Sequence, residues 1–140
     1  MLPTPEMLRR YSLFGGLVDA QLDQLIACLQ VDEVASGSTI VREGEKGDRL
    51  YCLVSGTVEV RRGDRLIARL GAGETIGEME LIDMQPRSAT VIAIEPCVLF
   101  ALSLRDILAL QRKDLPAFTL VMMNLARDLS RRLRQMDAAS

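Results

Sequence analysis

Two glutamates and one arginine lie close together in the segment IGEMELIDMQPRSATV, residues 76–91. Glu78 and Glu80 follow Gly77, which is a plausible N-cap for a short helix, and Arg87 comes a few residues later. A helix start offers unpaired backbone N–H groups and a positive dipole end, which bind phosphates. Arg87 can form a forked pair with a phosphate, whereas a carboxylate can accept hydrogen bonds from a sugar hydroxyl. The set fits a phosphorylated sugar, but on spacing alone a surface turn with an incidental Glu78–Arg87 ion pair is the simpler interpretation.

The composition excludes several kinds of function. The chain has 140 residues, of which 49% are hydrophobic and 26% charged, and its net charge is −2. These values are typical of one globular domain. A slightly negative net charge gives no electrostatic reason to expect DNA binding. The sequence has no histidine, which removes the commonest general base and metal ligand, so we predict no enzyme, no metal and no cofactor. No apolar run is long enough to span a membrane.

Three widely spaced cysteines, Cys28, Cys52 and Cys97, indicate reduced thiols rather than a disulfide framework. We therefore expect a cytoplasmic protein.

The pattern along the chain predicts helices, then strands, then helices. Apolar residues at helical spacing, from Leu22 to Leu29, predict an early helix that Asp19 caps. Short apolar runs separated by turn residues then predict a β sandwich or barrel. These runs are residues 39–41, 50–54, 57–60, 65–68 and 89–102, the last interrupted at Glu95-Pro96. We interpret the glycines of the turns, Gly44, Gly47, Gly56 and Gly73, as turn formers only.

Two helices are predicted to close the chain. Ser103 with Asp106 forms a capping box for the first, and Asp114 can cap a long helix over residues 115–136, with Pro116 in its first turn. On the long helix an apolar seam repeats with alternating spacings of four and three, as in a coiled coil. The seam residues are Phe118, Met122, Leu125 and Leu129. The seam fits a parallel homodimer, packing on the strands, or both.

Three segments together resemble the cyclic nucleotide-binding domain family of the catabolite activator protein and protein kinase A regulatory subunit type. They are SLFGGL at residues 12–17, IVREGEKGDRLYCLVSGTVEV at 40–60 and GEMELIDMQPRSATV at 77–91. The last is similar to the family's phosphate-binding cassette, with Gly-Glu at its start and Pro-Arg-x-Ala-Thr at its end. The resemblance covers most of the chain.

The resemblance implies a mainly β fold with flanking α-helices: a jelly-roll, or double-stranded β-helix, with short N-terminal helices, a cassette helix and a long C-terminal helix. We expect one domain over residues 1–140. Its parts would be N-terminal helices at 1–30, the β-roll at 31–102 with the cassette at 76–91, and C-terminal helices at 103–140.

The resemblance also assigns roles within the cassette. Glu78 would bind the ribose 2′-hydroxyl and Arg87 the exocyclic phosphate oxygens. The backbone N–H groups of Glu80 and Ser88 would complete the phosphate cradle, and the Ser88 hydroxyl would add a hydrogen bond. Thr90 would stand against a guanine. The whole implied ligand-binding set is Gly77, Glu78, Glu80, Arg87, Ser88, Ala89, Thr90, Val60, Ile67, Leu70 and Arg132.

Outside the cassette, the implied roles have simpler alternatives. Val60, Ile67 and Leu70 would line the base pocket, although core positions are at least as consistent with the sequence. Arg132 lies where the family's last helix often supplies a lid, and its guanidinium would stack on the base. Cations also favour a helix C-terminus, which is the plainer explanation of Arg132.

Glu80 is the departure from the family pattern, which usually has a small residue beside the phosphate. At roughly 4 Å, a carboxylate and a phosphate repel by about 4 kcal/mol at a partly screened dielectric. A hydrogen bond to a charged group contributes only about 1.5–3 kcal/mol. The side chain of Glu80 therefore opposes a ligand unless it points to solvent.

We therefore predict a non-catalytic sensor of a cyclic nucleotide, cAMP or cGMP, from a bacterial protein. It would form a homodimer through the C-terminal helix and signal to an effector protein, without binding DNA or a membrane. The alternatives are a degenerate domain that serves as a protein-interaction module, and a domain for another nucleotide such as cyclic di-GMP. An enzyme that uses Glu78 and Glu80 as a carboxylate pair is a distant third.

Overall fold

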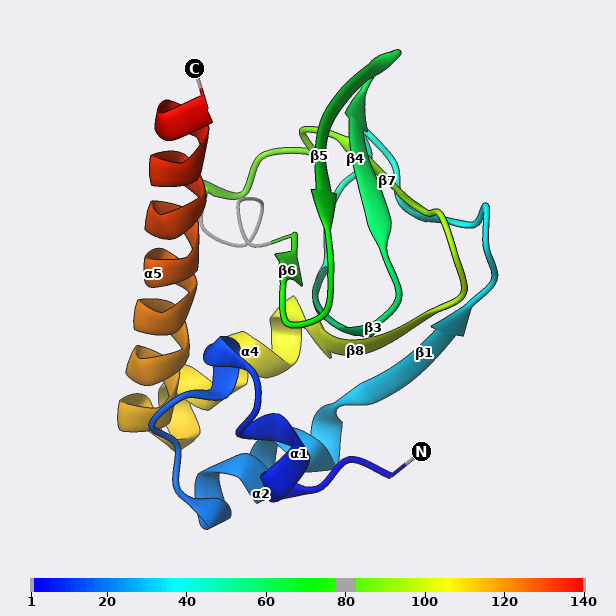
Figure 1. Cartoon of the computed structure of the whole chain (residues 1–140). Coiled ribbons are helices and arrows are strands. Elements are labelled where there is room, and N and C mark those ends of the chain that lie inside the picture. The colour runs from blue at the N-terminus through cyan, green and yellow to red at the C-terminus, as the bar shows by residue number, and fades with distance from the viewer. Residues whose placement is uncertain (1, 78–82, 140) are drawn as a thin grey trace. The chain divides into compact units, whose positions relative to one another are not determined.

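The computed structural model describes residues 2–77 and 83–139, with the helices and strands of Figure 1. The chain forms two compact units. The β-roll is Leu29–Arg105. The helical unit joins the chain up to Cys28 with the chain from Asp106 onward. The two helical segments that are separate in the sequence therefore belong to the same unit.

In the part of the chain that the structure describes, the β-roll has two four-stranded antiparallel sheets. The first sheet has the strand order β1-β8-β3-β6 and the second has the order β2-β7-β4-β5. The strands are β1 (Gln30–Val34), β2 (Thr39–Val41), β3 (Arg49–Ser55), β4 (Val58–Arg62), β5 (Arg65–Leu70), β6 (Thr75–Ile76), β7 (Thr90–Ala93) and β8 (Cys97–Ser103). This interleaved order is that of a jelly roll.

The two sheets enclose one apolar core, because alternate side chains along each strand point to the same face. Val58 on β4 and Val91 on β7 are directly paired with strand neighbours on that face and are almost fully buried. The buried core consists of Val41, Leu53, Val58, Ile76, Val91, Ala93, Cys97 and Leu99, which come from both sheets. The jelly-roll fold with flanking helices is thereby confirmed.

Most strands lie where the apolar runs predicted them. The run at residues 89–102 divides into β7 and β8 at Glu95-Pro96, as expected. The apolar runs did not predict β1. They also did not predict β6, which has only two residues and pairs with Tyr51 and Cys52 of β3. Cys28, Cys52 and Cys97 form no disulfide with one another. Cys52 and Cys97 are buried, and burial raises the pKa of the Cys97 thiol.

The helical unit contains the short helices near the N-terminus and the two C-terminal helices. They are α1 (Pro5–Leu8), the 3-10 turn η1 (Ser12–Phe14), α2 (Asp19–Cys28), most of α4 (Leu104–Lys113) and α5 (Leu115–Ala139). The Asp114 carboxylate accepts a hydrogen bond from the Ala117 N–H at 3.2 Å. Asp114 is therefore the N-cap of α5, as predicted.

The start of α2 differs from the prediction. Asp19 is the first residue of the helix rather than its N-cap, and its carboxylate pairs with Arg9. The residue before the helix is Val18, whose N–H donates to the Gln21 side chain at 3.0 Å. Gln21, the third residue of the helix, thus accepts from the N–H of the cap residue, which is one of the two hydrogen bonds of a capping box. This bond uses the backbone of the cap residue, so Val18 can fill the position without a polar side chain.

Two polar residues on the buried face of α5 hold the η1 turn. Asn124 donates to the carbonyls of Leu13 and Gly15, both at 3.0 Å. The Ser12 hydroxyl donates to the Asp128 carboxylate at 3.0 and 2.9 Å. Each of these two α5 residues is only 5% exposed.

The buried face of α5 therefore includes polar residues, and this changes the predicted seam. Leu125 lies beside Asn124 on that face and is 0% exposed within its own chain. Of the interpretations of the seam, the homodimer would place Leu125 against a partner helix, but this side chain is already buried within its own chain. Phe118, Met122 and Leu129 are half-buried and remain candidates.

Candidate functional site

Arg87 lies between β6 and β7 and is held by the loop that joins β2 to β3. Its N–H donates to the carbonyl of Glu45 at 2.8 Å, and its carbonyl accepts from the Gly44 N–H at 2.8 Å. Its side chain is buried, because the residue is 6% exposed. Nη2 donates to the carbonyl of Arg49 at 3.0 Å. Loop and strand backbone thus fix both the main chain and the guanidinium of Arg87.

Two glycines from different loops flank this guanidinium. A β-carbon at Gly47 would lie 2.6 Å from Cζ and Nε of Arg87. A β-carbon at Gly77 would lie 2.3 Å from Nη1 of Arg87 and 2.8 Å from the carbonyl of Arg49. The interpretation of Gly47 as a turn former only is therefore incomplete, because its missing side chain leaves room for Arg87.

The first half of the predicted cassette is only partly described. Gly77 has a φ of +92°, a left-handed conformation that favours glycine. Glu78 and Glu80 lie outside the described residues, as does the helix start predicted after Gly77. Their assigned roles stay predictions.

The residues after Arg87 differ in burial and in their hydrogen bonds. Ala89 is buried, and Val91 belongs to the core. Ser88 is half-buried, and its carbonyl accepts from Arg62 Nε at 3.2 Å. Thr90 pairs in register with Arg61, on the face opposite Val91, and its hydroxyl accepts from the Glu43 N–H at 3.0 Å. Arg87 and Ala89 are buried, whereas Thr90 is half-buried. The contact of Thr90 with a base stays a prediction.

The three residues assigned to the base pocket also separate. Val60 and Leu70 are half-buried and pack against the core of the roll. Ile67 is 36% exposed and lies where the register between β4 and β5 shifts, so it has no direct partner on β4. The structure brings Val60 and Leu70 together and leaves Ile67 outside that group, because the shifted register turns its side chain out.

Arg132 lies on α5 in the helical unit and is half-buried. Its role as a lid over the base stays a prediction.

Burial raises the pKa of Tyr51, and the positive charges of Arg49 and Arg87 partly oppose this effect. Tyr51 lies on β3, half-buried against the core of the roll. Its hydroxyl is therefore a neutral hydrogen-bonding group at physiological pH.

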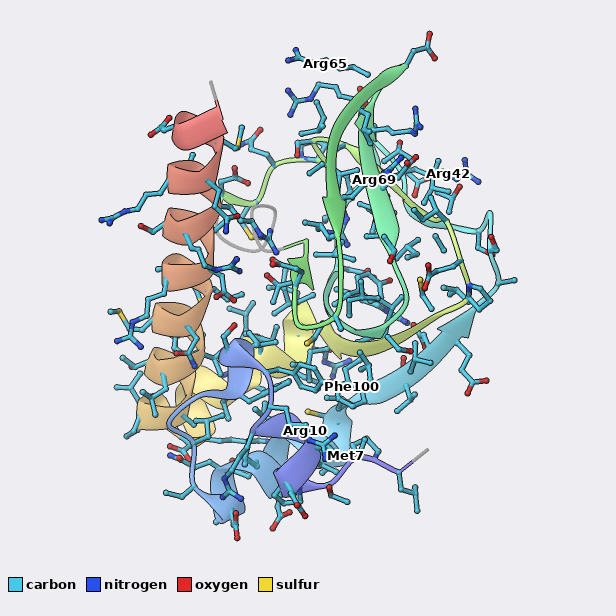
Figure 2. All side chains as sticks on the ribbon, viewed as in Figure 1. Met7, Arg10, Arg42, Arg65, Arg69 and Phe100 are labelled. Carbon is cyan, nitrogen blue, oxygen red and sulfur yellow. The ribbon has the colours of Figure 1, made fainter. Side chains whose placement is uncertain are left out.

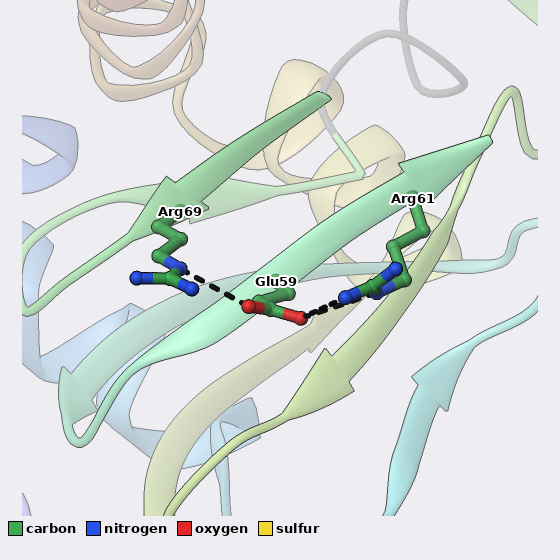
Figure 3. Close-up of polar contacts among 3 residues, drawn as sticks. All are labelled: Glu59, Arg61 and Arg69. Atoms are coloured by element: carbon green, nitrogen blue, oxygen red, sulfur yellow. Dashed lines mark hydrogen bonds and ion pairs between the residues drawn. The ribbon is translucent and has the colours of Figure 1, made fainter. Parts of the chain in front are cut away.

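A second charged cluster, which the sequence did not predict, lies on the outer face of β4 and β5. Glu59 accepts from Arg61 at 2.7 and 3.1 Å and from Arg69 at 3.0 Å, as Figure 3 shows. The hydrogen bond from Arg61, with further help from Arg69, lowers the pKa of Glu59 although burial opposes this. Figure 2 shows that Arg65 lies near the hairpin end and Arg69 further along β5. Because Glu59 and Arg69 are cross-strand partners, knowledge of the strand register would have revealed the pair.

In the described ranges, no helix is long and apolar enough to cross a membrane. The same residues contain no group of three or more cysteine, aspartate or glutamate side chains placed to hold a metal ion.

The profile of the cyclic nucleotide-binding domain matches residues 31–114, which is more than half of the chain and includes Arg87 and its flanking glycines. The chain belongs to the cyclic nucleotide-binding domain family. This confirms the family that the cassette motif indicated.

Several regulators are similar to the chain. It is 41% identical over 130 residues to the cyclic AMP receptor protein of Thermus thermophilus, covering 89% of this chain and 58% of that protein. It is 37% identical over 90 residues to a cAMP-dependent protein kinase regulatory subunit of Yarrowia lipolytica, covering 64% and 24%. The chain thus spans from about a quarter to somewhat over half of these relatives.

Two solved structures are also similar to this chain. The catabolite activator protein of Thermus thermophilus has a TM-score of 0.75 at 40% identity, covering 91% of this chain and 61% of that one. A cyclic nucleotide-binding domain from Methylobacillus flagellatus has a TM-score of 0.83 at 29% identity, covering 93% and 76%.

Proposed function

We propose that this domain is a non-catalytic sensor that binds a cyclic nucleotide, cAMP or cGMP, with Arg87 as the anchor of the phosphate. The observation that carries the proposal is the buried guanidinium of Arg87, held by the Arg49 carbonyl between Gly47 and Gly77. A charged group is costly to bury, so a fixed and buried guanidinium is better explained by recognition of an anion than by surface solvation.

The other roles follow the cassette motif. In our proposal Glu78 accepts a hydrogen bond from the ribose 2′-hydroxyl, and the backbone N–H groups of Glu80 and Ser88 complete the phosphate cradle. The Ser88 hydroxyl adds a further bond. On the apolar side, Val60 and Leu70 support the base, because both lie half-buried on the inner face of the roll.

The names of the relatives support a ligand of this class. They include a cyclic AMP receptor protein, a cAMP-dependent protein kinase regulatory subunit and a cGMP-dependent protein kinase. Because both cyclic nucleotides occur in these names, we leave the base unassigned. We propose no reaction for the site, since the sequence lacks histidine, the commonest general base.

Binding of the nucleotide would change the arrangement of the C-terminal helices, and this change would be the signal to a partner. We propose a homodimer through α5, with an effector protein as the further partner. The support is a series on α5 that recurs every seven residues, namely Leu115, Met122, Leu129 and Met136. The first and last of these residues, Leu115 and Met136, are 56% and 61% exposed. For the 140-residue chain we propose no binding to duplex DNA, since its net charge is −2.

A second candidate is an interaction module that has lost the ligand, and Glu80 favours it. One similar structure is a mutant regulatory subunit of a cAMP-independent protein kinase A from Trypanosoma brucei, 28% identical with a TM-score of 0.75. That mutant, which is bound to cAMP, replaces a glutamate by alanine and, seven residues later, a threonine by arginine. Glu80 and Arg87 are also seven residues apart. This spacing supports opposite effects of Glu80 and Arg87 on a ligand.

The test is calorimetry on the purified chain with cAMP, cGMP and cyclic di-GMP, with 5′-AMP as the control nucleotide. We expect saturable binding of cAMP or cGMP and none of 5′-AMP. Binding of cyclic di-GMP alone would replace the proposed ligand by the other nucleotide. If no nucleotide binds or raises the melting temperature, the sensor proposal is wrong and the interaction module remains.

A further inference from the structure

The guanidinium of Arg87 lies in a slot whose two walls are glycines. Gly47 precedes β3 and Gly77 follows β6, and these two strands are hydrogen-bonded neighbours. At both positions a β-carbon would come closer to Arg87 than side chains approach each other in proteins. The slot therefore requires two residues without side chains at the place where two strands meet.

The two walls differ in what a side chain would displace. At Gly77 a β-carbon would meet the Arg49 carbonyl at 2.8 Å, and the φ of +92° disfavours other residues. A substitution there would strain the backbone itself. Gly47 has no left-handed φ, and the atoms closest to its β-carbon would all belong to the Arg87 side chain, Cζ and Nε at 2.6 Å and Cδ at 3.1 Å.

We infer that Gly47 is a positioning residue for the ligand, which acts by setting the orientation of the Arg87 guanidinium. This inference rests on the proposed function. An alanine at position 47 would be accommodated by moving the flexible end of Arg87, not the backbone. The moved guanidinium would lose its hydrogen bond to the Arg49 carbonyl and its alignment with a phosphate. Since forked recognition depends on geometry, affinity would fall much more than stability.

Gly71 provides a matched control. It also has no left-handed φ, and a β-carbon there would meet nothing within 4 Å. Gly71→Ala makes the same chemical change in the same unit, the β-roll, without contacting Arg87. Its affinity for cyclic nucleotide should equal that of the parent.

The experiment measures cAMP and cGMP affinity by calorimetry and melting temperature for the parent, Gly47→Ala and Gly71→Ala. We expect Gly47→Ala to lose at least about tenfold in affinity, to remain folded, and to melt only slightly earlier. A parent that binds and a Gly47→Ala variant that binds equally well would overturn the inference and leave the proposed function intact.

A second arm does not depend on ligand binding. The melting temperatures of Gly47→Ala are compared in the parent and in the Arg87→Ala background, with Arg87→Lys as a further background in case Arg87→Ala does not fold. If Gly47 acts through the Arg87 side chain, the alanine costs stability in the parent and little or none without that side chain. An equal cost in all backgrounds would overturn the inference, whether or not the parent binds nucleotide. If the parent binds no nucleotide, the proposed function fails, and coupling in the melts would still establish the steric slot.

Discussion

Asn124 on α5 donates hydrogen bonds to the carbonyls of Leu13 and Gly15, which are more than a hundred residues earlier in the chain. The single side chain satisfies two backbone acceptors of the SLFGG turn. Its 5% exposure leaves little room for water to replace it. The Asn124 amide therefore joins η1 to α5, beside the hydrogen bond from Ser12 to Asp128.

Asn124→Ala should destabilise the protein by about 1–3 kcal/mol, because one buried and one partly buried carbonyl would lose their donor. Urea unfolding of the parent and the variant measures the difference. Thr119→Ala is the control, since its exposed hydroxyl donates to the Leu115 carbonyl of its own helix. The control should stay within about 0.5 kcal/mol of the parent. Equal effects of the two substitutions would contradict the role of Asn124.

Glu59 should make the stability depend on pH. Its pKa is lower in the folded than in the unfolded protein, so its stabilising contribution is present above the unfolded value and is lost as the pH falls through the folded value. Glu59→Gln should melt earlier than the parent at neutral pH, and the gap should close on acidification. The measurement is a series of thermal melts from neutral pH to pH about 3. Glu95→Gln, at an exposed position, is the control, and a gap that closes in the same way for it would refute the assignment.

Arg87→Lys should weaken nucleotide binding at least about tenfold, or roughly 1.4 kcal/mol, because lysine keeps the charge but lacks the fork. Calorimetry with the nucleotide that binds the parent provides the measurement. Arg42→Lys makes the same change at a side chain that is 66% exposed and should leave affinity unchanged. Unchanged affinity in Arg87→Lys would remove Arg87 as the anchor.

Glu80→Ala should bind cyclic nucleotide more tightly than the parent, while the empty protein becomes slightly less stable. At the third position of the predicted helix, Glu80 would reach back to the cap N–H and gain about 0.3–1 kcal/mol from the helix dipole. The Glu80 carboxylate would thus interact with the same positive end of the helix dipole that a phosphate would use. Paired calorimetry and thermal melts on both proteins test this prediction, and a variant that binds no better than the parent would show that the carboxylate points away from the phosphate.

The α5 stripe should hold a dimer in solution. We use this name for the series that recurs every seven residues, namely Leu115, Met122, Leu129 and Met136. Leu133, which is 61% exposed, lies near Leu129 and Met136 on the helix surface. We expect light scattering to give a dimer mass for the parent and a folded monomer for Leu133→Glu. Gln135→Glu adds a charge away from the stripe and should leave the dimer unchanged. A monomeric parent at high micromolar concentration would exclude this assembly. Leu125→Glu is not a suitable test, because that side chain is buried within its own chain.

Six of the strands, β2 to β5, β7 and β8, were predictable because alternation and turn residues are local properties of the sequence. The two-residue strand β6 was not, since it is defined only by its pairing with β3. The cap of α5 by Asp114 was likewise local and was confirmed. Asn124 and Asp128 have a polar character that suggests exposure, and only their distant partners in η1 explain their burial.

The candidate site also contains residues that the sequence predicts and residues that it does not. Arg87 followed from a motif, whereas the role of Gly47 depends on a contact between residues forty positions apart. A glycine in a turn-rich segment gives no sign of which side chain fills the space beside it. On β7, one residue of register decides whether a side chain faces the core, as Val91 does, or the opposite face, as Thr90 does.

The strand order of the roll has a consequence for how the chain folds. β1 pairs with β8, and β2 with β7, so the first strands made have their partners near residue 100. The hairpin of β4 and β5 is the local exception. Loop closure must therefore precede most of the sheet pairing, which predicts slow folding, on the order of milliseconds to seconds. A nascent chain that ends before Cys97 would hold β1 without its partner, and the first sheet would assemble only after β8 leaves the ribosome.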